Sequence, residues 1–166
     1  FNKAIENLRK KGQKLSAKRA DREAKEGVVI AKTSANKNNG IVVRLSCETD
    51  FVSKGEDFVA LAESFAEIAL KSLPADKDAL LALPYEDMTV GEKVEQQTGV
   101  IGEKIDVSAI EVVEAEHVIA YNHPGNKLAS IVGLNKAGEA VADAGKQVAM
   151  QVAAMAPIAL SEDQVD

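Results

Sequence analysis

The chain has 166 residues, of which 46% are hydrophobic and 28% charged, and its net charge is −6. These values are typical of one globular domain, or a domain with attached fragments, and the acidic balance argues against a general nucleic-acid binder. No apolar run reaches the roughly eighteen residues that a membrane-spanning helix needs, and the single Cys47 is typical of a reduced, cytoplasmic protein.

Residues 1–25 form a basic segment in front of an acidic body. They carry nine Lys or Arg and three Asp or Glu, a net charge of +6, so the remaining residues carry −12. We predict one long helix over residues 3–25, with a thin apolar stripe at Ile5, Leu8 and Leu15. Three interpretations stay open: a solvated helix, a basic contact surface for RNA or protein, and a latch onto the chain's own acidic body. Because the stripe thins after Leu15, we expect this helix to be partly detached from the core.

Residues 27–47 predict a β-hairpin. Two runs rich in β-branched residues, 27–30 and 41–45, flank a polar segment that ends in Asn39-Gly40, a pair that readily adopts positive φ in tight turns. The second run ends in the polar stretch Cys47-Glu48-Thr49-Asp50-Phe51-Val52. Phe51 therefore lies at a corner, where it either folds back into the core or points outward as an anchor for a partner.

Helical patterns follow this corner. Apolar residues at helical spacing predict a helix over 56–72 that ends before Pro74, and a short helix over 76–83 stops before Pro84. Thr89 and Glu92 form the pattern of a capping box at the start of the next helix. That helix contains Gly residues at 91, 99 and 102, so we expect a break or close packing there.

The last third of the chain alternates between strand and helix patterns. Residues 110–114, 117–121 and 128–134 are predicted strands, the last two joined by a hairpin loop around Pro124 and Gly125. An alanine-rich helix over 140–155 follows, and residues 161–163 are typical of the cap of a further helix. The predicted fold is α+β: an antiparallel sheet of three to four strands with helices packed mainly on one face, preceded by the long basic helix.

Motifs of nucleotide, metal and hydrolytic chemistry are missing from the sequence. It contains neither a P-loop nor a Gly-x-Gly-x-x-Gly turn, and His117, His123 and one Cys are a poor set of ligands for zinc. Ser46, Cys47 and Asp50 have no His near them in sequence. We therefore expect no catalytic residues, no metal and no cofactor in this chain.

Three ordered segments resemble the bacterial elongation factor Ts family. The signature-like segment runs Gly40-Ile41-Val42-Val43-Arg44-Leu45-Ser46-Cys47-Glu48-Thr49-Asp50-Phe51-Val52, and the others are Gly102-Glu103-Lys104-Ile105 and Val148-Ala149-Met150-Gln151-Val152-Ala153-Ala154-Met155-Ala156-Pro157. The resemblance implies a cytoplasmic guanine-nucleotide exchange factor for the translational GTPase elongation factor Tu. It also implies that the chain is not an enzyme and has no small-molecule substrate.

The resemblance also implies which residues contact the GTPase. Asp50 and Phe51 correspond to the family's pair that enters near the magnesium and phosphates of the GTPase. The full expected set is Thr49, Asp50, Phe51, Val52, Lys127, Leu128, Ala129, Gln147 and Gln151. Familiar members have Ile-Gly where this chain has Leu128-Ala129, and some have His where it has Gln147 and Gln151, so an amide would have to take over any hydrogen bond of the imidazole.

The resemblance divides the chain into three parts. Residues 1–25 correspond to the end of a helical amino-terminal domain and a linker, 26–157 to an α+β core, and 158–166 to the start of a further subdomain. A chain that opens on Phe1 and ends at Asp166 in this frame is expected to be a truncated form. The alternative function is an RNA-associated or structural interaction module that uses the basic helix of residues 1–25.

Overall fold

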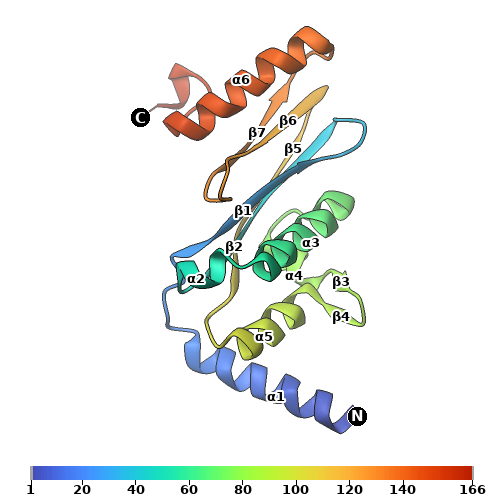
Figure 1. Ribbon diagram of the computed structural model, residues 1–166. Helices are drawn as coiled ribbons and strands as arrows, with labels where there is room; N and C mark the ends of the chain where they lie inside the picture. Colours follow the sequence, from blue (N-terminus) through green and yellow to red (C-terminus); the bar gives the residue numbers. More distant parts are fainter. Residues whose placement is uncertain (1, 166) are drawn as a thin grey trace.

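The computed structural model describes residues 2–165, and for Asn2, Ile5 and Leu8 it describes the main chain only, so the expected apolar stripe at Ile5 and Leu8 lies outside the described side chains. Figure 1 shows the arrangement of the elements. In chain order they are α1 (Asn2–Arg19), β1 (Glu26–Thr33), β2 (Asn39–Cys47), α2 (Asp50–Ser53), α3 (Glu56–Ser72), α4 (Lys77–Ala82), β3 (Pro84–Tyr85), β4 (Met88–Thr89), α5 (Val90–Ile101), β5 (Asp106–Glu114), β6 (His117–Asn122), β7 (Ala129–Leu134), α6 (Glu139–Met155) and a 3-10 turn (Glu162–Gln164). The predicted α+β class is confirmed.

The main sheet has three antiparallel strands in the order β1-β2-β5, with β2 in the centre. One face carries α3, which packs on β1 and β2, and α4 lies between β5 and α5. The β6–β7 hairpin pairs only within itself and packs on the main sheet, and α6 covers the hairpin from outside (Figure 1). The helices that pack on the main sheet thus gather on one face, as predicted, while α6 belongs to the layer beyond the hairpin.

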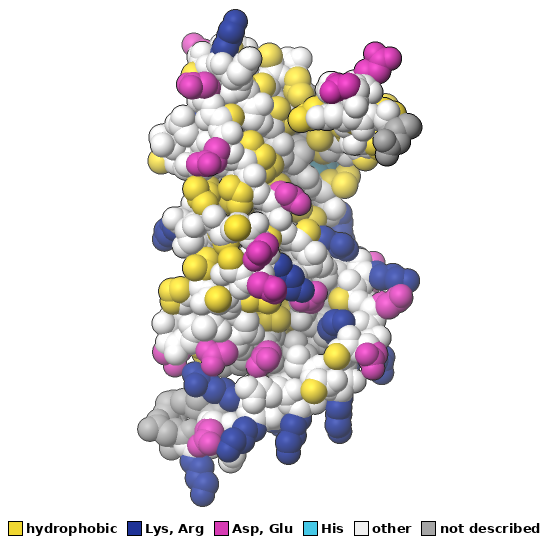
Figure 2. All heavy atoms as spheres, turned by 180° about the vertical axis from the view of Figure 1, so that it is seen from behind, with side chains coloured by type: hydrophobic (Ala, Val, Ile, Leu, Met, Phe, Trp, Pro, Cys, Tyr) yellow, Lys and Arg dark blue, Asp and Glu magenta, His cyan; other side chains and the backbone are white. Residues whose placement is uncertain are grey.

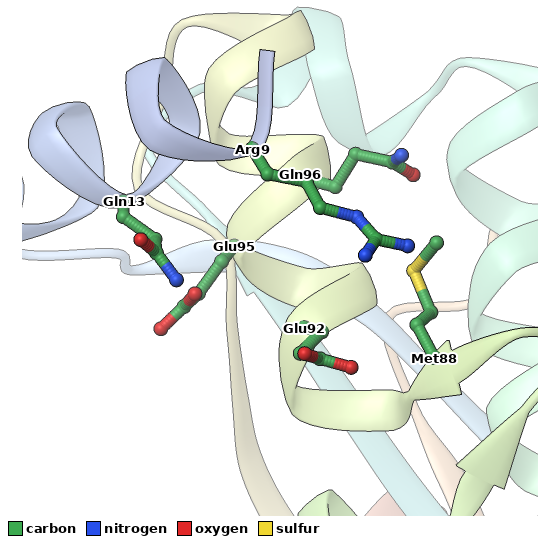
Figure 3. Close-up of a pocket in the computed structure, with 6 residues that line it drawn as sticks. All are labelled: Arg9, Gln13, Met88, Glu92, Glu95 and Gln96. Carbon is green, nitrogen blue, oxygen red and sulfur yellow. The ribbon is translucent and has the colours of Figure 1, made fainter. Parts of the chain in front are cut away.

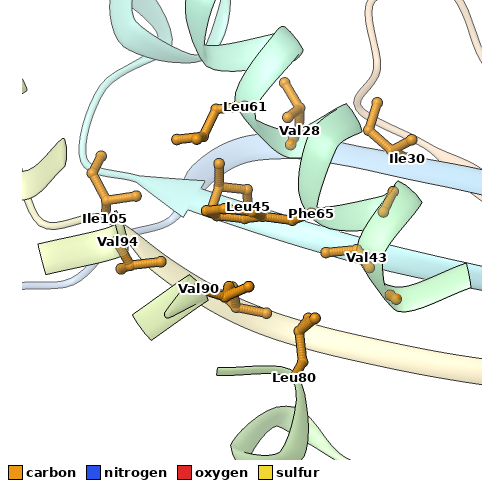
Figure 4. Packing of buried hydrophobic residues seen from close by; sticks show 14 of the residues in the cluster. Val28, Ile30, Val43, Leu45, Leu61, Phe65, Leu80, Val90, Val94 and Ile105 are labelled. Atoms are coloured by element: carbon orange, nitrogen blue, oxygen red, sulfur yellow. The ribbon is translucent and has the colours of Figure 1, made fainter. Parts of the chain in front are cut away.

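The core lies between α3 and the main sheet. Val28 pairs with Leu45 and Ile30 with Val43, so these four side chains share one face of the sheet. Phe65 of α3 is fully buried in the same cluster, as Figure 4 shows. Each such side chain contributes about 1.5–3 kcal/mol to the free energy of folding. The strand pairs and the helical stripe of α3 therefore confirm the hairpin and helix that the sequence predicts.

Small residues let the outer layers approach the sheet. A Cβ atom on Gly40 of β2 would lie 2.5 Å from Val118 Cγ1 of β6, and one on Gly145 of α6 would lie 2.5 Å from Leu134 Cδ1 of β7. The lack of a side chain at Gly145 therefore allows α6 to pack closely on β7.

The basic helix is shorter and more firmly placed than predicted. It ends at Arg19 rather than at residue 25, because the main-chain carbonyls of Ala20 and Arg22 turn to accept hydrogen bonds from Lys104 Nζ at 2.5 and 3.0 Å. The expected detachment is wrong, since α1 packs on α5 at a glycine contact: a Cβ on Gly99 would lie 2.8 Å from Gly12 Cα. This contact also confirms the close packing expected at the glycines of α5.

Ion pairs of Arg9, Arg19 and Arg22 tie the basic segment to the acidic body, and the pair of Arg22 with Glu48 is the longest at 3.8 Å. Arg9 Nη2 lies 3.3 Å from Asp87 Oδ2, and Arg19 Nη1 lies 2.6 Å from Glu48 Oε1. These contacts support the interpretation of a latch onto the chain itself. Other basic side chains of α1 remain exposed, and Figure 2 shows Lys and Arg side chains projecting from this lower end of the molecule. The exposed lysines are Lys3, Lys10, Lys11, Lys14 and Lys18.

Candidate functional site

Phe51 points into solvent. Its side chain is 85% exposed, whereas Phe58 and Phe65 are 4% and 0% exposed. The ring extends from the single turn of α2, which follows an extended Thr49 at φ −122°. Val52, the next residue, is half-buried and packs against the core, so it anchors the turn that carries the ring. Of the two interpretations of this corner, the outward one is the one that the structure supports.

A carboxylate from another loop holds the main chain just before the ring. Glu103 Oε2 accepts hydrogen bonds from the main-chain N–H groups of Glu48 (3.0 Å) and Thr49 (2.9 Å), and Glu103 Oε1 accepts one from Thr49 Oγ1 (2.6 Å). Residues 48–53, which we call the Phe51 corner, are thereby fixed to the loop after α5. Thr49 is used inside the chain by this contact.

Glu48 makes the reverse contact. Its Oε1 accepts a hydrogen bond from the main-chain N–H of Lys104 at 2.7 Å and one from Arg19 Nη1 at 2.6 Å. The hydrogen bond from Lys104, followed by that from Arg19, holds the pKa of Glu48 below its ordinary value. Glu48 is therefore an ionised acceptor that joins the end of α1 to the Phe51 corner.

Asp50 is ionised and half-exposed beside the ring. Its Oδ2 lies 2.6 Å from Lys54 Nζ, and the hydrogen bond and charge of that ammonium group lower the pKa of Asp50. Because both side chains remain largely in water, the pair is weak and Asp50 can exchange Lys54 for a cationic or N–H donor of a partner.

Cys47 lies beneath the Phe51 corner as a packing residue. It is fully buried, and its Sγ donates to the carbonyl of Thr49 at 3.2 Å. Burial, followed by the negative charge of Glu103, raises the pKa of the Cys47 thiol to about 11. The thiol is therefore neutral at pH 7, which does not suit a nucleophile.

The β6–β7 turn lies beside the Phe51 corner. Residues 123–128, which we call the hairpin tip, contain Lys127, whose Nζ donates to Ser53 Oγ (2.8 Å), to Glu26 Oε2 (2.8 Å) and to the carbonyl of Gly27 (3.0 Å). The next residue, Leu128, is 48% exposed. Ser53 and Lys127 are 74 residues apart in sequence, and their hydrogen bond brings the segments that carry Phe51 and Leu128 side by side.

The contact surface continues onto α6. A groove of about 260 Å³ lies between the hairpin tip and the second half of α6, and Leu128, Met150 and Gln151 are among its lining residues. Gln147 is exposed one turn earlier on α6, outside the residues that line this groove. Ala129 is half-buried and begins β7 opposite Asn122, so it supports the hairpin tip rather than extending from it.

The pocket beneath the first helix has little room for a small ligand. That cavity lies between α1 and α5 and holds about 20 Å³, which suits roughly one water molecule (Figure 3). Within residues 2–165, no group of three or more His, Cys, Asp or Glu side chains is arranged to hold a metal ion. Over the same residues, no helix combines the length and the apolar character needed to cross a membrane.

Comparison with known proteins identifies the family. A family model described as Elongation factor TS matches residues 48–166, which begin at the Phe51 corner. This chain belongs to the elongation factor Ts family. Elongation factor Ts of Christiangramia forsetii is 48% identical over 166 residues, 100% of this chain and 60% of that relative. Elongation factor Ts of Chloroherpeton thalassium is 49% identical over 172 residues, 99% of this chain and 60% of that relative. The chain therefore spans about three-fifths of the length of these curated relatives.

Sequence reasoning found the exposed residues of this elongation factor Ts surface but missed those that hold them. Glu103 lies in one of the segments that carry the family resemblance, yet its three hydrogen bonds to Glu48 and Thr49 span 54 and 55 residues of sequence. Ser53 likewise gains its contact with Lys127 only after folding, whereas Lys54 pairs with Asp50 only four residues away. The one sequence signal for Glu103 is a carboxylate that directly follows a glycine at a helix end. Such carboxylates are common on protein surfaces, so the signal does not identify a contact.

Proposed function

We propose that the protein is a translation factor that binds the GTPase elongation factor Tu and promotes the release of GDP. The observation that carries this proposal is Phe51, an aromatic side chain 85% exposed on a corner whose main chain is held by hydrogen bonds. A rigid exposed aromatic ring is the usual form of an energetic anchor in protein interfaces. Membership of the elongation factor Ts family supports the choice of partner and process.

In this proposal the exchange involves no bond breaking. The ring of Phe51 and the carboxylate of Asp50 enter the GTPase near its magnesium and phosphate site, as the family resemblance implies. The factor binds the nucleotide-free GTPase more strongly than the GDP complex. By thermodynamic reciprocity, the affinity of the GTPase for GDP is lowered by the same factor. A ring wedged between packed elements suits this mechanism, because packed interiors shift between discrete arrangements.

Leu128 and the groove beside it supply a second contact in the same proposal. Leu128 is exposed at the hairpin tip, and Met150 and the neighbouring alanines extend the apolar surface onto α6. An apolar contact at Leu128 and this groove would add affinity without touching the nucleotide site. Gln147 and Gln151 are exposed amides that can donate and accept hydrogen bonds at its rim.

The test is the release of fluorescently labelled GDP from purified elongation factor Tu, with and without this protein. We expect release to accelerate with the concentration of the protein and to saturate. The Phe51→Ala variant should lose about 30-fold or more in apparent affinity, which corresponds to about 2 kcal/mol. Unchanged GDP release in the presence of the folded wild-type protein would contradict the proposal.

A further inference from the structure

Two glutamates make reciprocal contacts at the base of the Phe51 corner. The Glu103 carboxylate binds the main-chain N–H groups of Glu48 and Thr49, while the Glu48 carboxylate binds the main-chain N–H of Lys104. Each side chain thus accepts hydrogen bonds from the segment that carries the other. We call this arrangement the glutamate clasp, and it joins the end of β2 to the loop after α5.

The glutamate clasp lies just beyond the last hydrogen-bonded residues of β2. The pairing of β2 with β5 ends at Ser46 opposite Asp106, and the pairing of β2 with β1 ends at Cys47 opposite Glu26. The N–H groups of Glu48 and Thr49 are therefore beyond the strand ladder, and Glu103 supplies their acceptor. Main-chain N–H groups that are partly shielded from water need such a partner.

We propose that Glu103 is a positioning residue for the Phe51 anchor, an inference that rests on the proposed function. The ring is 85% exposed, so its own packing contributes little to its direction. Its orientation depends on the main chain that leads to it, and Glu103 holds Glu48 and Thr49 there through two main-chain N–H groups and the Thr49 hydroxyl. Because the segment is ordered before the partner arrives, binding does not have to order it, and this preserves affinity.

Glu103 also places Thr49 in its extended conformation. Glu103 Oε1 accepts the Thr49 hydroxyl at 2.6 Å while Oε2 accepts the Thr49 N–H at 2.9 Å, so both oxygens of one carboxylate hold one residue. This residue precedes the first turn of α2, from which Phe51 extends. A side chain at position 103 with only one acceptor oxygen can satisfy only part of this set.

The experiment compares Glu103→Ala and Glu103→Gln with a matched control, Glu92→Ala. Glu92 is also a carboxylate that accepts a main-chain N–H, that of Thr89 at 2.8 Å, but it lies at the opposite end of α5, about 14 Å along the helix axis from the last helical residue, Ile101. Hydrogen exchange measures the protection of the Glu48 and Thr49 amides, and labelled GDP release from elongation factor Tu measures function per folded molecule.

For Glu103→Ala we expect at least tenfold faster exchange of the Glu48 and Thr49 amides and at least a tenfold higher concentration for half-maximal GDP release. Glu103→Gln, which keeps one acceptor oxygen, should recover part of both losses. Glu92→Ala should lower the melting temperature yet leave both quantities unchanged. Wild-type amide protection together with wild-type GDP release in Glu103→Ala would overturn the inference.

A double-mutant cycle separates positioning from simple destabilisation. In a Phe51→Ala background, Glu103→Ala should cause little further loss of GDP release, because the ring that it positions is gone. Fully additive losses would overturn the positioning role. An inactive wild-type protein, or a fully active Phe51→Ala variant, would overturn the proposed function and this role with it, whereas a fully active Glu103→Ala variant beside an impaired Phe51→Ala variant overturns the present inference alone.

Discussion

Phe51 and Phe65 show how one residue type takes opposite roles in this chain. Phe65 is fully buried between α3 and the main sheet, where its ring stacks edge-on against Tyr85 with centroids 5.6 Å apart. Phe51 is 85% exposed on a single helical turn. Burial of an aromatic ring stabilises the fold, whereas an exposed ring adds little to the fold and is available to a partner.

Truncating the two rings should therefore give opposite results. Phe51→Ala should lower the free energy of unfolding by less than about 1 kcal/mol, because little buried area is lost. Phe65→Ala should lower it by about 3–5 kcal/mol through the cavity that it leaves. Thermal or urea unfolding of both variants, with GDP release measured on the folded fraction, checks the pair. A Phe51→Ala protein that is strongly destabilised yet fully active would show that the ring is part of the core.

Glu48 predicts a pH dependence of the link between α1 and the Phe51 corner. Its folded pKa lies below the ordinary value of 4.5, so its contribution to stability is present above pH 4.5 and is lost as the pH falls through the folded pKa. We expect wild-type protein to be more stable than Glu48→Gln at pH 7 and this difference to shrink below pH 4.5. Urea unfolding from pH 7 to pH 3 measures it, and a difference that grows on acidification would contradict the assignment.

At the scale of the elements, local chemistry predicts most of the fold. The β1–β2 hairpin, the apolar stripe of α3 and the capping box of Thr89 and Glu92 form where the sequence places them. The turn itself differs from the prediction, because Asn39 and Gly40 lie in β2 and the positive φ is at Lys37. The end of α1 and the stacking of the β6–β7 hairpin on the main sheet could not be predicted this way. Both depend on contacts between distant segments, such as Lys104 with the carbonyls after α1, which have no local pattern.

The same limit applies to the site. The exposed members, Phe51 and Leu128, could be proposed from a corner, a hairpin loop and a family resemblance. Val52 and Ala129 are half-buried, and the contact with the GTPase that the resemblance implies for them stays a prediction. Whether a side chain in a short segment points outward depends on what packs beneath it, and the sequence does not show this directly.

The contact between α1 and α5 depends on two glycines. In an exposed helix, Gly→Ala normally stabilises by about 1 kcal/mol. Here Gly99→Ala would place a Cβ 2.8 Å from Gly12 Cα, a main-chain atom that cannot turn away, so we expect a net loss of about 1–3 kcal/mol. Val100→Ala, at a neighbouring position that is 73% exposed, is the control and should change stability by less than about 0.5 kcal/mol. Amide exchange in α1 should become faster in Gly99→Ala and stay unchanged in Val100→Ala.

Lys127 joins two elements of the proposed contact surface. Lys127→Met keeps the length of the side chain but removes its hydrogen bonds to Ser53, Glu26 and Gly27, so we expect a loss of about 1 kcal/mol, since the ammonium is partly exposed. Lys136→Met, in the exposed segment before α6, is the control. The Val29 N–H donates to the carbonyl of Asn126, and its exchange rate should rise in Lys127→Met but not in Lys136→Met. Equal exchange in both variants would show that the hairpin tip is held by other contacts.

At the scale of the whole molecule, charge is divided between a basic end and an acidic body. Residues 1–25 carry +6 and the rest −12, and the exposed lysines of α1 lie along the lower end in Figure 2. An RNA-binding module would bind RNA through these lysines, and its affinity for RNA would fall steeply with added salt. The affinity of an interface anchored by Phe51 and Leu128 depends mainly on apolar burial and changes little with salt.

Salt titration therefore distinguishes the two modes of action. Between 50 and 200 mM salt, an RNA complex with 6–10 phosphate contacts loses about 10³–10⁵ in affinity, whereas we expect the concentration for half-maximal GDP release to change by less than about tenfold. Replacing the four lysines Lys10, Lys11, Lys14 and Lys18 by Gln should leave that concentration nearly unchanged at 150 mM salt. A loss of GDP release in this variant, with normal amide exchange at the Phe51 corner, would assign the contact to α1 instead.

The side chain of Asn122 has a consequence for how two contacts combine. Its amide binds both the N–H and the carbonyl of Ala31, at 2.8 and 2.9 Å, so the hairpin is joined to β1 as though by one more strand residue. With Lys127 on the other side of the tip, this leaves Phe51 and Leu128 on one stiff frame. Once either side chain engages a partner, the other meets its own binding site at an effective concentration set by the frame, in the millimolar range or above, instead of by diffusion. Loosening Asn122 would thus weaken avidity even though neither contacting side chain had changed.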